Sequence, residues 1–161
     1  MALGMAISQQ INNTDARAYA LLSDGECNEG SIWEAAMLAS AKRVSNLTAI
    51  IDYNKWQATG RSQEIMQLEP LAKKWEAFGW RTHEIDGHNM EEITAALESS
   101  RKQEDKPTAI VAHTVKGKGV SFMEDDNNWH YRTPNEEELD KALKELGAVE
   151  IRPVSYTHLT L

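Results

Sequence analysis

The sequence predicts an α/β fold, a parallel sheet with helices on both faces, and two short stretches carry most of that prediction. Leu21–Glu26 and Ile50–Lys55 are each an apolar run that ends abruptly in oxygen-bearing side chains. The segment Ser31–Val44 between them has helical periodicity. Strand, acidic turn, helix, strand and amide turn make a βαβ unit, in which both strands end at the same edge of the sheet.

The first elements follow from apolar runs and the polar stretches that separate them. Ala2–Ile11 is predicted to be an apolar helix, and the polar stretch Asn12–Arg17 is typical of a turn. Ala18–Ser23 is apolar enough to be a strand buried on both faces of a parallel sheet. Asp24–Gly30 contains two glycines and three acidic residues, and is predicted to loop over the end of this strand.

The middle of the chain supplies the second helix and the second strand. Ser31 is predicted to cap the helix, and Glu34 three positions later completes a capping box. The apolar run Leu47–Asp52 is the second strand. Tyr53–Met66 is predicted to be a long polar connection, and Glu69–Phe78 a helix that begins near a proline and ends at a glycine.

The last third of the chain adds two strands and two helices. Trp80–Ile85 alternates like a strand, Met90–Arg101 is helical, and the apolar run Thr108–His113 is a further strand. Asn135 is predicted to cap a final acidic helix that ends near Gly147. Five large side chains are assigned to the core, namely Met5, Trp33, Met37, Trp75 and Trp80.

The length of 161 residues fits one domain with a sizeable core. The predicted domain spans residues 1–150. It is expected to lack an upstream part, because a domain rarely begins inside a packed apolar helix. Residues 151–161 carry no acidic residue and no evident periodicity, and are predicted to be a non-native or disordered tail.

Charge and composition argue against several classes of partner. The formal net charge is −8 and there is no basic run, whereas duplex binding needs Lys and Arg to neutralise phosphates, so no nucleic acid is expected. No apolar run approaches the roughly 20 residues that span a bilayer, so no membrane is expected. The single Cys27 cannot form an internal disulfide, and the N-terminus has no signal-peptide pattern, so the predicted location is cytoplasmic.

Asp24 and Asn54 are the strongest candidates for chemistry, because each follows a predicted strand of the βαβ unit. Ligands bind at that edge of open α/β sheets, and Mg²⁺ takes one or two protein oxygens together with substrate phosphates. Gly25 would let a backbone N–H approach a phosphate closely. The residues therefore predict a metal-bound diphosphate. The alternative is an ordinary Asp-Gly turn and a loop asparagine.

Four further polar residues are candidates of lesser weight. Glu26 and Glu29 share a crowded acidic loop with Asp24, where close like charges can recruit a cation. Glu34 lies just inside the helix, and the alternative is that it does no more than complete the cap. His130 follows a tryptophan in an irregular stretch, where a structural or surface role is the alternative.

Taken together, these residues resemble the thiamine diphosphate-binding family, and within it the diphosphate-binding domain of transketolase. The family signature is Gly-Asp-Gly, a spacer and then Asn, and here it reads Ser23-Asp24-Gly25 and Asp52-Tyr53-Asn54. Three other stretches carry the resemblance, namely Glu29-Gly30-x-x-x-Glu34-Ala35-Ala36, Asn46-Leu47-x-Ala49-Ile50 and Lys116-Gly117-Lys118-Gly119-Val120-Ser121-Phe122-Met123-Glu124. The match runs from about Leu3 to Gly147.

The resemblance implies roles for individual residues. Asp24, Asn54 and the backbone carbonyl of Trp56 would hold Mg²⁺, which bridges the two phosphates of the cofactor. Gly25 and the neighbouring Glu26 would lie at the diphosphate. The catalytic set would add three residues: Glu29 and Glu34, in an acidic network at the subunit interface, and His130, beside the diphosphate and the reacting carbon.

The implied reaction moves a two-carbon ketol unit from a ketose phosphate to an aldose phosphate in the pentose phosphate pathway. The family's upstream loop and its pyrimidine-binding domain are absent from this sequence. The chain is therefore interpreted as a truncated N-terminal subunit of a split transketolase. It is expected to need a pyrimidine-binding subunit, in a homodimer or heterotetramer, and to be inactive alone.

Two residues depart from the family pattern, and three alternative functions stay open. Ser23 replaces the first glycine of the signature, and Tyr131 stands where long transketolases have glycine. A 1-deoxyxylulose phosphate synthase or a dehydrogenase E1 component would use the same cofactor. A non-catalytic α/β interaction module would keep the fold without the activity, and an unrelated Mg²⁺-dependent phosphohydrolase is the least favoured alternative.

Overall fold

Within residues 1–102 and 104–148, the part of the chain that the computed structural model describes, four parallel strands form one sheet. In spatial order the strands are β1 (Ala18–Ser23), β2 (Leu47–Tyr53), β6 (Thr108–His113) and β5 (Arg81–Asp86). The register pairs Ser23 with Asp52, and Asp52 with Ala112. The carboxyl ends of β1, β2 and β6 therefore lie nearly level at one edge of the sheet.

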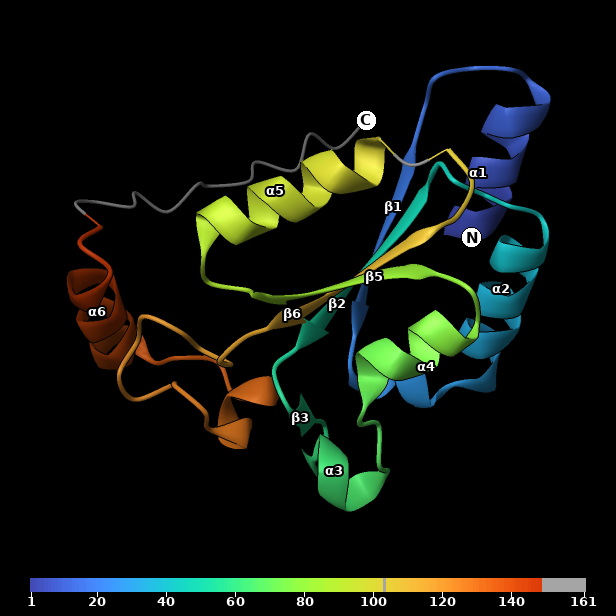
Figure 1. Ribbon diagram of the computed structural model, residues 1–161. Coiled ribbons are helices and arrows are strands. Elements are labelled where there is room, and N and C mark those ends of the chain that lie inside the picture. The colour runs from blue at the N-terminus through green and yellow to red at the C-terminus, as the bar shows by residue number, and fades with distance from the viewer. Residues whose placement is uncertain (103, 149–161) are drawn as a thin grey trace, which may run out of the picture. The chain divides into compact units, whose positions relative to one another are not determined.

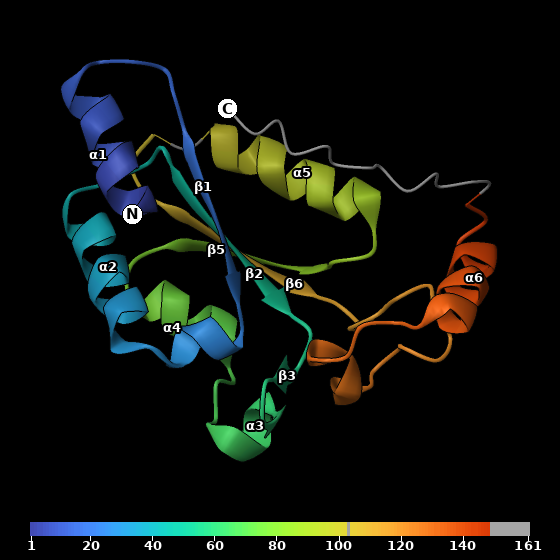
Figure 2. The same cartoon turned by 180° about the vertical axis from the view of Figure 1, so that it is seen from behind.

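Helices cover both faces of this sheet (Figure 1; Figure 2). On one face lie α1 (Ala2–Ile11), α2 (Gly30–Ala41) and α4 (Leu71–Ala77), and on the other lies α5 (Met90–Arg101). The predicted fold class, a parallel sheet with helices on both faces, is confirmed. The βαβ unit that predicted it corresponds to β1, α2 and β2.

The main core lies between the sheet and the helices α1, α2 and α4. Trp75 is its centre, with ring centroids 5.2 Å from Trp33 and 4.8 Å from Trp80. The indole N–H of Trp80 donates to a backbone carbonyl of α2 at 2.9 Å, which satisfies its polar atom inside the core. The core assignments of Met5 and Met37 were wrong, because their side chains are 58% and 51% exposed on the outer sides of α1 and α2.

Strand β1 is not buried on both faces, which corrects the prediction from its apolar composition. Its residues alternate between partly buried and exposed, and Leu21 is 73% exposed. The physical reason is position, because β1 is the edge strand beside β2 and α5 packs against β5 and β6. An apolar sequence alone does not tell an edge strand from a central one.

Two predicted connections contain structure, and one predicted cap is wrong. The loop after β1 is a short 3₁₀ helix, Gly25–Asn28. The connection after β2 contains a hairpin of β3 (Trp56–Gln57) and β4 (Gly60–Arg61), followed by α3 (Ser62–Ile65). Helix α2 begins at Gly30 with Glu29 at its N-cap, so Ser31 lies inside the first turn and the predicted capping box of Ser31 and Glu34 does not form.

The described chain divides into two compact units, Met1–Lys116 and the residues from Gly117 onward. The second unit contains a 3₁₀ helix, Asn127–His130, and α6 (Glu136–Glu145). Asn135 caps α6, as predicted, and the structure shows that it does so in a full capping box with Glu138. Residues 1–150 as a single domain stays a prediction, and the predicted tail 151–161 lies outside the described residues.

In the described residues, none of the helices has both the length and the apolar character that a membrane crossing needs.

Candidate metal and diphosphate site

The candidate site lies where β1 and β2 end side by side. Asp24 directly follows β1 and Asn54 directly follows β2, as the parallel pairing predicts. The Asp24 N–H donates to the carbonyl of Asp52 at 3.3 Å, which continues the ladder past the last strand residue of β1. The backbone N–H of Lys55 in turn donates to the Asp24 carboxyl group. The turns after the two strands are therefore joined through Asp24.

The Asp24 carboxyl group is fully buried and accepts only neutral donors within the described part of the chain. Oδ1 accepts the Gly25 N–H at 2.8 Å, Oδ2 accepts the Ser62 hydroxyl at 2.7 Å, and the Lys55 N–H adds a third bond. Burial raises the pKa of Asp24 above its ordinary value, the three hydrogen bonds oppose the rise, and the nearby Asp52 charge adds to it. A cation at this carboxylate would offset the cost of burying its charge.

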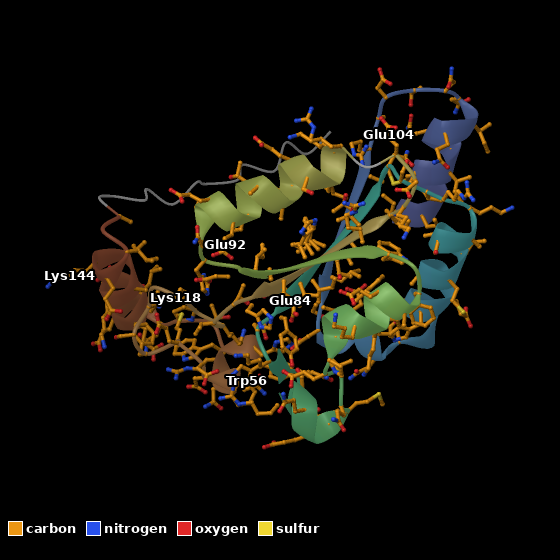
Figure 3. All side chains as sticks on the ribbon, viewed as in Figure 1. Trp56, Glu84, Glu92, Glu104, Lys118 and Lys144 are labelled. Atoms are coloured by element: carbon orange, nitrogen blue, oxygen red, sulfur yellow. The ribbon has the colours of Figure 1, made fainter. Side chains whose placement is uncertain are left out.

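The Asn54 carboxamide is held at both ends. Its Nδ2 donates to Asp52 Oδ2 at 3.2 Å, and its Oδ1 accepts the Trp56 N–H at 2.9 Å. The other oxygen of Asp52 accepts the hydroxyl of Thr114, which follows the end of β6. Figure 3 shows Trp56 in the hairpin after β2, where the Arg61 guanidinium lies 3.8 Å from the centre of its ring.

Gly25 contacts a glutamine in this structure. A Cβ atom at Gly25 would lie 3.2 Å from Cγ of Gln57, so the glycine allows the β3 side chain to pack closely over its Cα. The carboxamide of Gln57 accepts a hydrogen bond from Asn28 Nδ2 at 2.9 Å. Within the part of the chain that the structure describes, Asn28 Oδ1 and Gln57 Nε2 are buried and have no hydrogen-bond partner.

The other acidic candidates have exposed side chains. Glu26 forms a reciprocal pair with Ser23, in which its carboxylate accepts the Ser23 N–H at 3.4 Å and its own N–H donates to the Ser23 hydroxyl at 3.0 Å. Glu29 is the N-cap residue of α2, and Glu34 lies on the exposed side of that helix. An interface role for Glu29 and Glu34 stays a prediction.

His130 lies in the second unit, at the end of its 3₁₀ helix. Its ring is exposed and meets the ring of Tyr131 edge-on, with centroids 4.8 Å apart. Tyr131 is the residue that departs from the family pattern. The predicted role of His130 beside the diphosphate stays a prediction.

Three residues of the site were missed by sequence reasoning. Asp52 and Thr114 carried a usable signal, because both are polar and lie at the carboxyl ends of predicted strands, where Asn54 was found. Ser62 carried no such signal, because it reaches Asp24 from the start of α3, 38 positions along the chain.

The arrangement offers hard oxygen ligands. A buried carboxylate and a neighbouring amide oxygen suit a divalent cation of the Mg²⁺ type, which completes its shell with waters and phosphates. Residues 1–102 and 104–148 contain no group of three or more His, Cys, Asp or Glu side chains placed to hold a metal ion. The candidate set is of another kind, with one carboxylate, one amide and one backbone carbonyl.

Comparison with known proteins gives consistent matches. The model of a family described as the thiamine diphosphate-binding domain of transketolase matches residues 5–155. A 6-deoxy-6-sulfo-D-fructose transketolase subunit of Clostridium sp. is 46% identical over 145 residues, which are 90% of this chain and 53% of that protein. One of the apulose-4-phosphate transketolase subunits, from Phocaeicola vulgatus, is 40% identical over 147 residues, 91% of this chain and 52% of that protein.

A solved structure shows the same likeness. The transketolase of Campylobacter jejuni superposes with a TM-score of 0.83 at 31% identity, over 91% of this chain and 24% of that one. The chain spans about half the length of the two curated relatives. The family match, the relatives and the shared fold lead to one conclusion: the chain belongs to the transketolase family and matches its thiamine diphosphate-binding domain.

Proposed function

We propose that the sheet edge around Asp24 binds Mg²⁺ and, through it, the diphosphate of thiamine diphosphate. The observation that carries this proposal is the fully buried Asp24 carboxyl group, which has only neutral donors around it in the described chain and lies beside the turn of Asn54. Asp24, Asn54 and the carbonyl of Trp56 would be the protein ligands. Gly25 and Glu26 would lie on the cofactor side, and His130 beside the diphosphate.

The activity we propose is that of a transketolase component, which transfers a two-carbon ketol unit from a ketose phosphate to an aldose phosphate. When bound, thiamine diphosphate supplies the thiazolium carbanion for this chemistry. The residues of this chain bind and orient: Asp24 and Asn54 hold the metal, and Ser62 fixes the carboxyl group of Asp24. The match to relatives that are named as transketolase subunits supports this assignment.

A partner chain belongs to the same proposal. A second subunit would supply the pyrimidine-binding domain, in a homodimer or a heterotetramer, with Glu29 and Glu34 at the interface. The chain alone is then expected to be inactive. A cytoplasmic location and a place in the pentose phosphate pathway complete the proposal.

The decisive test is a calorimetric titration of thiamine diphosphate into the folded chain, first with Mg²⁺ and then with EDTA. Saturable binding that requires the metal is the expected result. If the folded chain alone does not bind, the titration is repeated with the pyrimidine-binding subunit of a two-subunit relative. Absence of metal-dependent binding in that complex would contradict the proposal.

Replacing Ser62 by alanine is expected to weaken Mg²⁺-dependent cofactor binding by roughly 10- to 100-fold, the usual cost of losing a residue that orients a metal ligand. The physical reason is that Asp24 Oδ2 loses its hydroxyl donor at 2.7 Å and the carboxyl group becomes free to rotate. The measurement is the Kd from the same titration. The exposed Ser31→Ala on α2 is the matched control, and an unchanged Kd in a folded Ser62→Ala chain would show that Ser62 does not orient the carboxyl group.

A further inference from the structure

A continuous chain of hydrogen bonds runs across the sheet edge behind Asn54. The Thr114 hydroxyl donates to Asp52 Oδ1, Asp52 Oδ2 accepts Asn54 Nδ2 at 3.2 Å, and Asn54 Oδ1 accepts the Trp56 N–H at 2.9 Å. Thr114 follows the end of β6, and Asp52 lies near the end of β2. The chain of bonds therefore joins two neighbouring strands to the hairpin that begins at β3.

The donors and acceptors in this series of hydrogen bonds allow only one orientation of the Asn54 carboxamide. An amide has a donor end and an acceptor end, and only its oxygen can bind a metal ion. The Asp52 carboxylate is acceptor-only, so it requires the nitrogen end, and the Trp56 N–H requires the oxygen end. A flipped amide would place oxygen against oxygen and N–H against N–H, so both bonds would be lost.

Thr114 holds the Asp52 side chain in the position that favours this orientation of the Asn54 amide. Asp52 is only half-buried, and its side chain could otherwise turn away from Asn54. The Thr114 hydroxyl occupies one Asp52 oxygen and leaves the other to face the amide. Asn54 Oδ1 accepts one N–H in this arrangement and keeps a second lone pair, which is the one a cation would use.

We propose that Asp52, anchored by Thr114, is a positioning residue that sets the amide orientation of Asn54 and thereby presents its oxygen to Mg²⁺. This inference rests on the proposed function for its metal, but the orientation itself is a property of the metal-free chain. Neither Asp52 nor Thr114 contacts the metal in this scheme. Both act through Asn54.

The test compares five variants and one control of the full chain, and of its complex with the partner subunit if the chain alone does not bind. Asp52→Asn is expected to raise the Kd for Mg²⁺-thiamine diphosphate by roughly 10- to 100-fold, the range for residues that orient metal ligands. Thr114→Val keeps the Asp52 charge and removes its anchor, and is expected to raise the Kd by a factor in the same range. Thr114→Ser keeps a hydroxyl and should restore tight binding. Thr94→Val on α5 is the matched control for the threonine change.

The last two variants are the single change Asn54→Asp and the reciprocal exchange of Asp52→Asn with Asn54→Asp. In this double variant, the new amide at position 52 can accept from Thr114 and donate to the new carboxylate at position 54. That carboxylate has an oxygen at both ends, so it accepts the Trp56 N–H in either orientation. The exchange should restore binding to within about 10-fold of wild type, whereas each single change should weaken binding. This pattern would show strong energetic coupling between positions 52 and 54.

A second readout needs neither metal nor cofactor. In the metal-free chain, the Asn54 side-chain NH₂ should give a resolved pair of ¹H–¹⁵N signals that is protected from exchange by its bond to Asp52. Thr114→Val and Asp52→Asn should both lose this protection, while circular dichroism and thermal unfolding report whether each variant is folded. Thr94→Val should keep it.

The outcomes separate the two proposals. If Thr114→Val leaves both the Kd and the Asn54 signals as in wild type, while Asp52→Asn weakens binding, Asp52 acts through its charge and the inference is overturned. If the wild-type complex does not bind the cofactor, the proposed function fails. In that case the Asn54 side-chain signals alone test the inference about Asp52 and Thr114. Loss of their exchange protection in Thr114→Val supports the inference, and unchanged protection overturns it.

Discussion

Asp24→Asn is expected to weaken Mg²⁺-dependent thiamine diphosphate binding strongly and, at the same time, to stabilise the metal-free chain. In the proposed complex, Asp24 and Mg²⁺ form a buried charge pair. Losing one member of such a pair costs about 2–5 kcal/mol of binding free energy. This corresponds to a rise in Kd of roughly 30- to 4,000-fold. The stabilisation has a separate cause, because burial makes the ionised form of Asp24 unfavourable in the absence of a cation.

The pKa of Asp24 determines the pH at which Asp24→Asn is more stable than the wild type. Burial raises the pKa of folded Asp24 above its ordinary value of 3.8. Below 3.8 the residue is protonated in both the folded and the unfolded states. As the pH rises through the raised folded-state pKa, the unfolded chain releases the proton more readily, so the wild type loses stability. The difference in unfolding free energy between Asp24→Asn and wild type should therefore be small at acid pH and should increase toward neutral pH.

Thermal unfolding of both metal-free chains, from below pH 3.8 to neutral pH, measures this difference. Asp105→Asn is the matched control, because Asp105 is an exposed loop residue and its replacement should change stability by no more than about 0.5 kcal/mol. Addition of Mg²⁺ and thiamine diphosphate should then stabilise the wild type more than Asp24→Asn. A variant that is less stable than wild type at neutral pH would show that Asp24 is structural in the metal-free fold.

Trp75→Ala is expected to cause the largest loss of stability among single core changes, about 3–5 kcal/mol. Trp75 is 2% exposed and contacts Trp33 and Trp80, with ring centroids 5.2 and 4.8 Å away, so truncation leaves a cavity that rigid neighbours cannot fill. The total stability of a domain is only about 5–15 kcal/mol, so the variant should be close to unfolding.

Urea unfolding followed by circular dichroism measures this loss, and an unchanged m-value would show that the two-state comparison holds. Met90→Ala removes a large apolar side chain that is exposed at the start of α5, and should stay within about 0.5 kcal/mol of wild type. A loss below about 1 kcal/mol for Trp75→Ala would mean that α4 and α2 close over the vacated space.

The order of elements could be predicted because each carries a local signal. Buried apolar runs marked β2 and β6, and helical periodicity marked α2 and α5. The proximity of Asp24 and Asn54 could also be predicted, because the carboxyl ends of neighbouring parallel strands must meet at one edge. These inferences need only the chain direction and the periodicity of the sequence.

Other features depend on contacts between residues that are distant in the chain. The open face of β1 at Leu21 depends on which strand occupies the edge and where α5 packs. The exposure of Met5 and Met37 depends on which side of each helix faces the sheet. Both are decided by packing, for which composition is a weak guide.

By itself, the sequence determined the fold class and the βαβ unit, and it predicted Asp24 and Asn54 as the two residues whose oxygens are most suited to a metal. Only the tertiary structure decided what holds them, because Ser62 reaches Asp24 from 38 positions away and Thr114 reaches Asp52 from 62. A ligand at a strand end follows from local pattern and direction, whereas the orientation of its carboxyl or amide group depends on hydrogen bonds that form only when distant segments pack together.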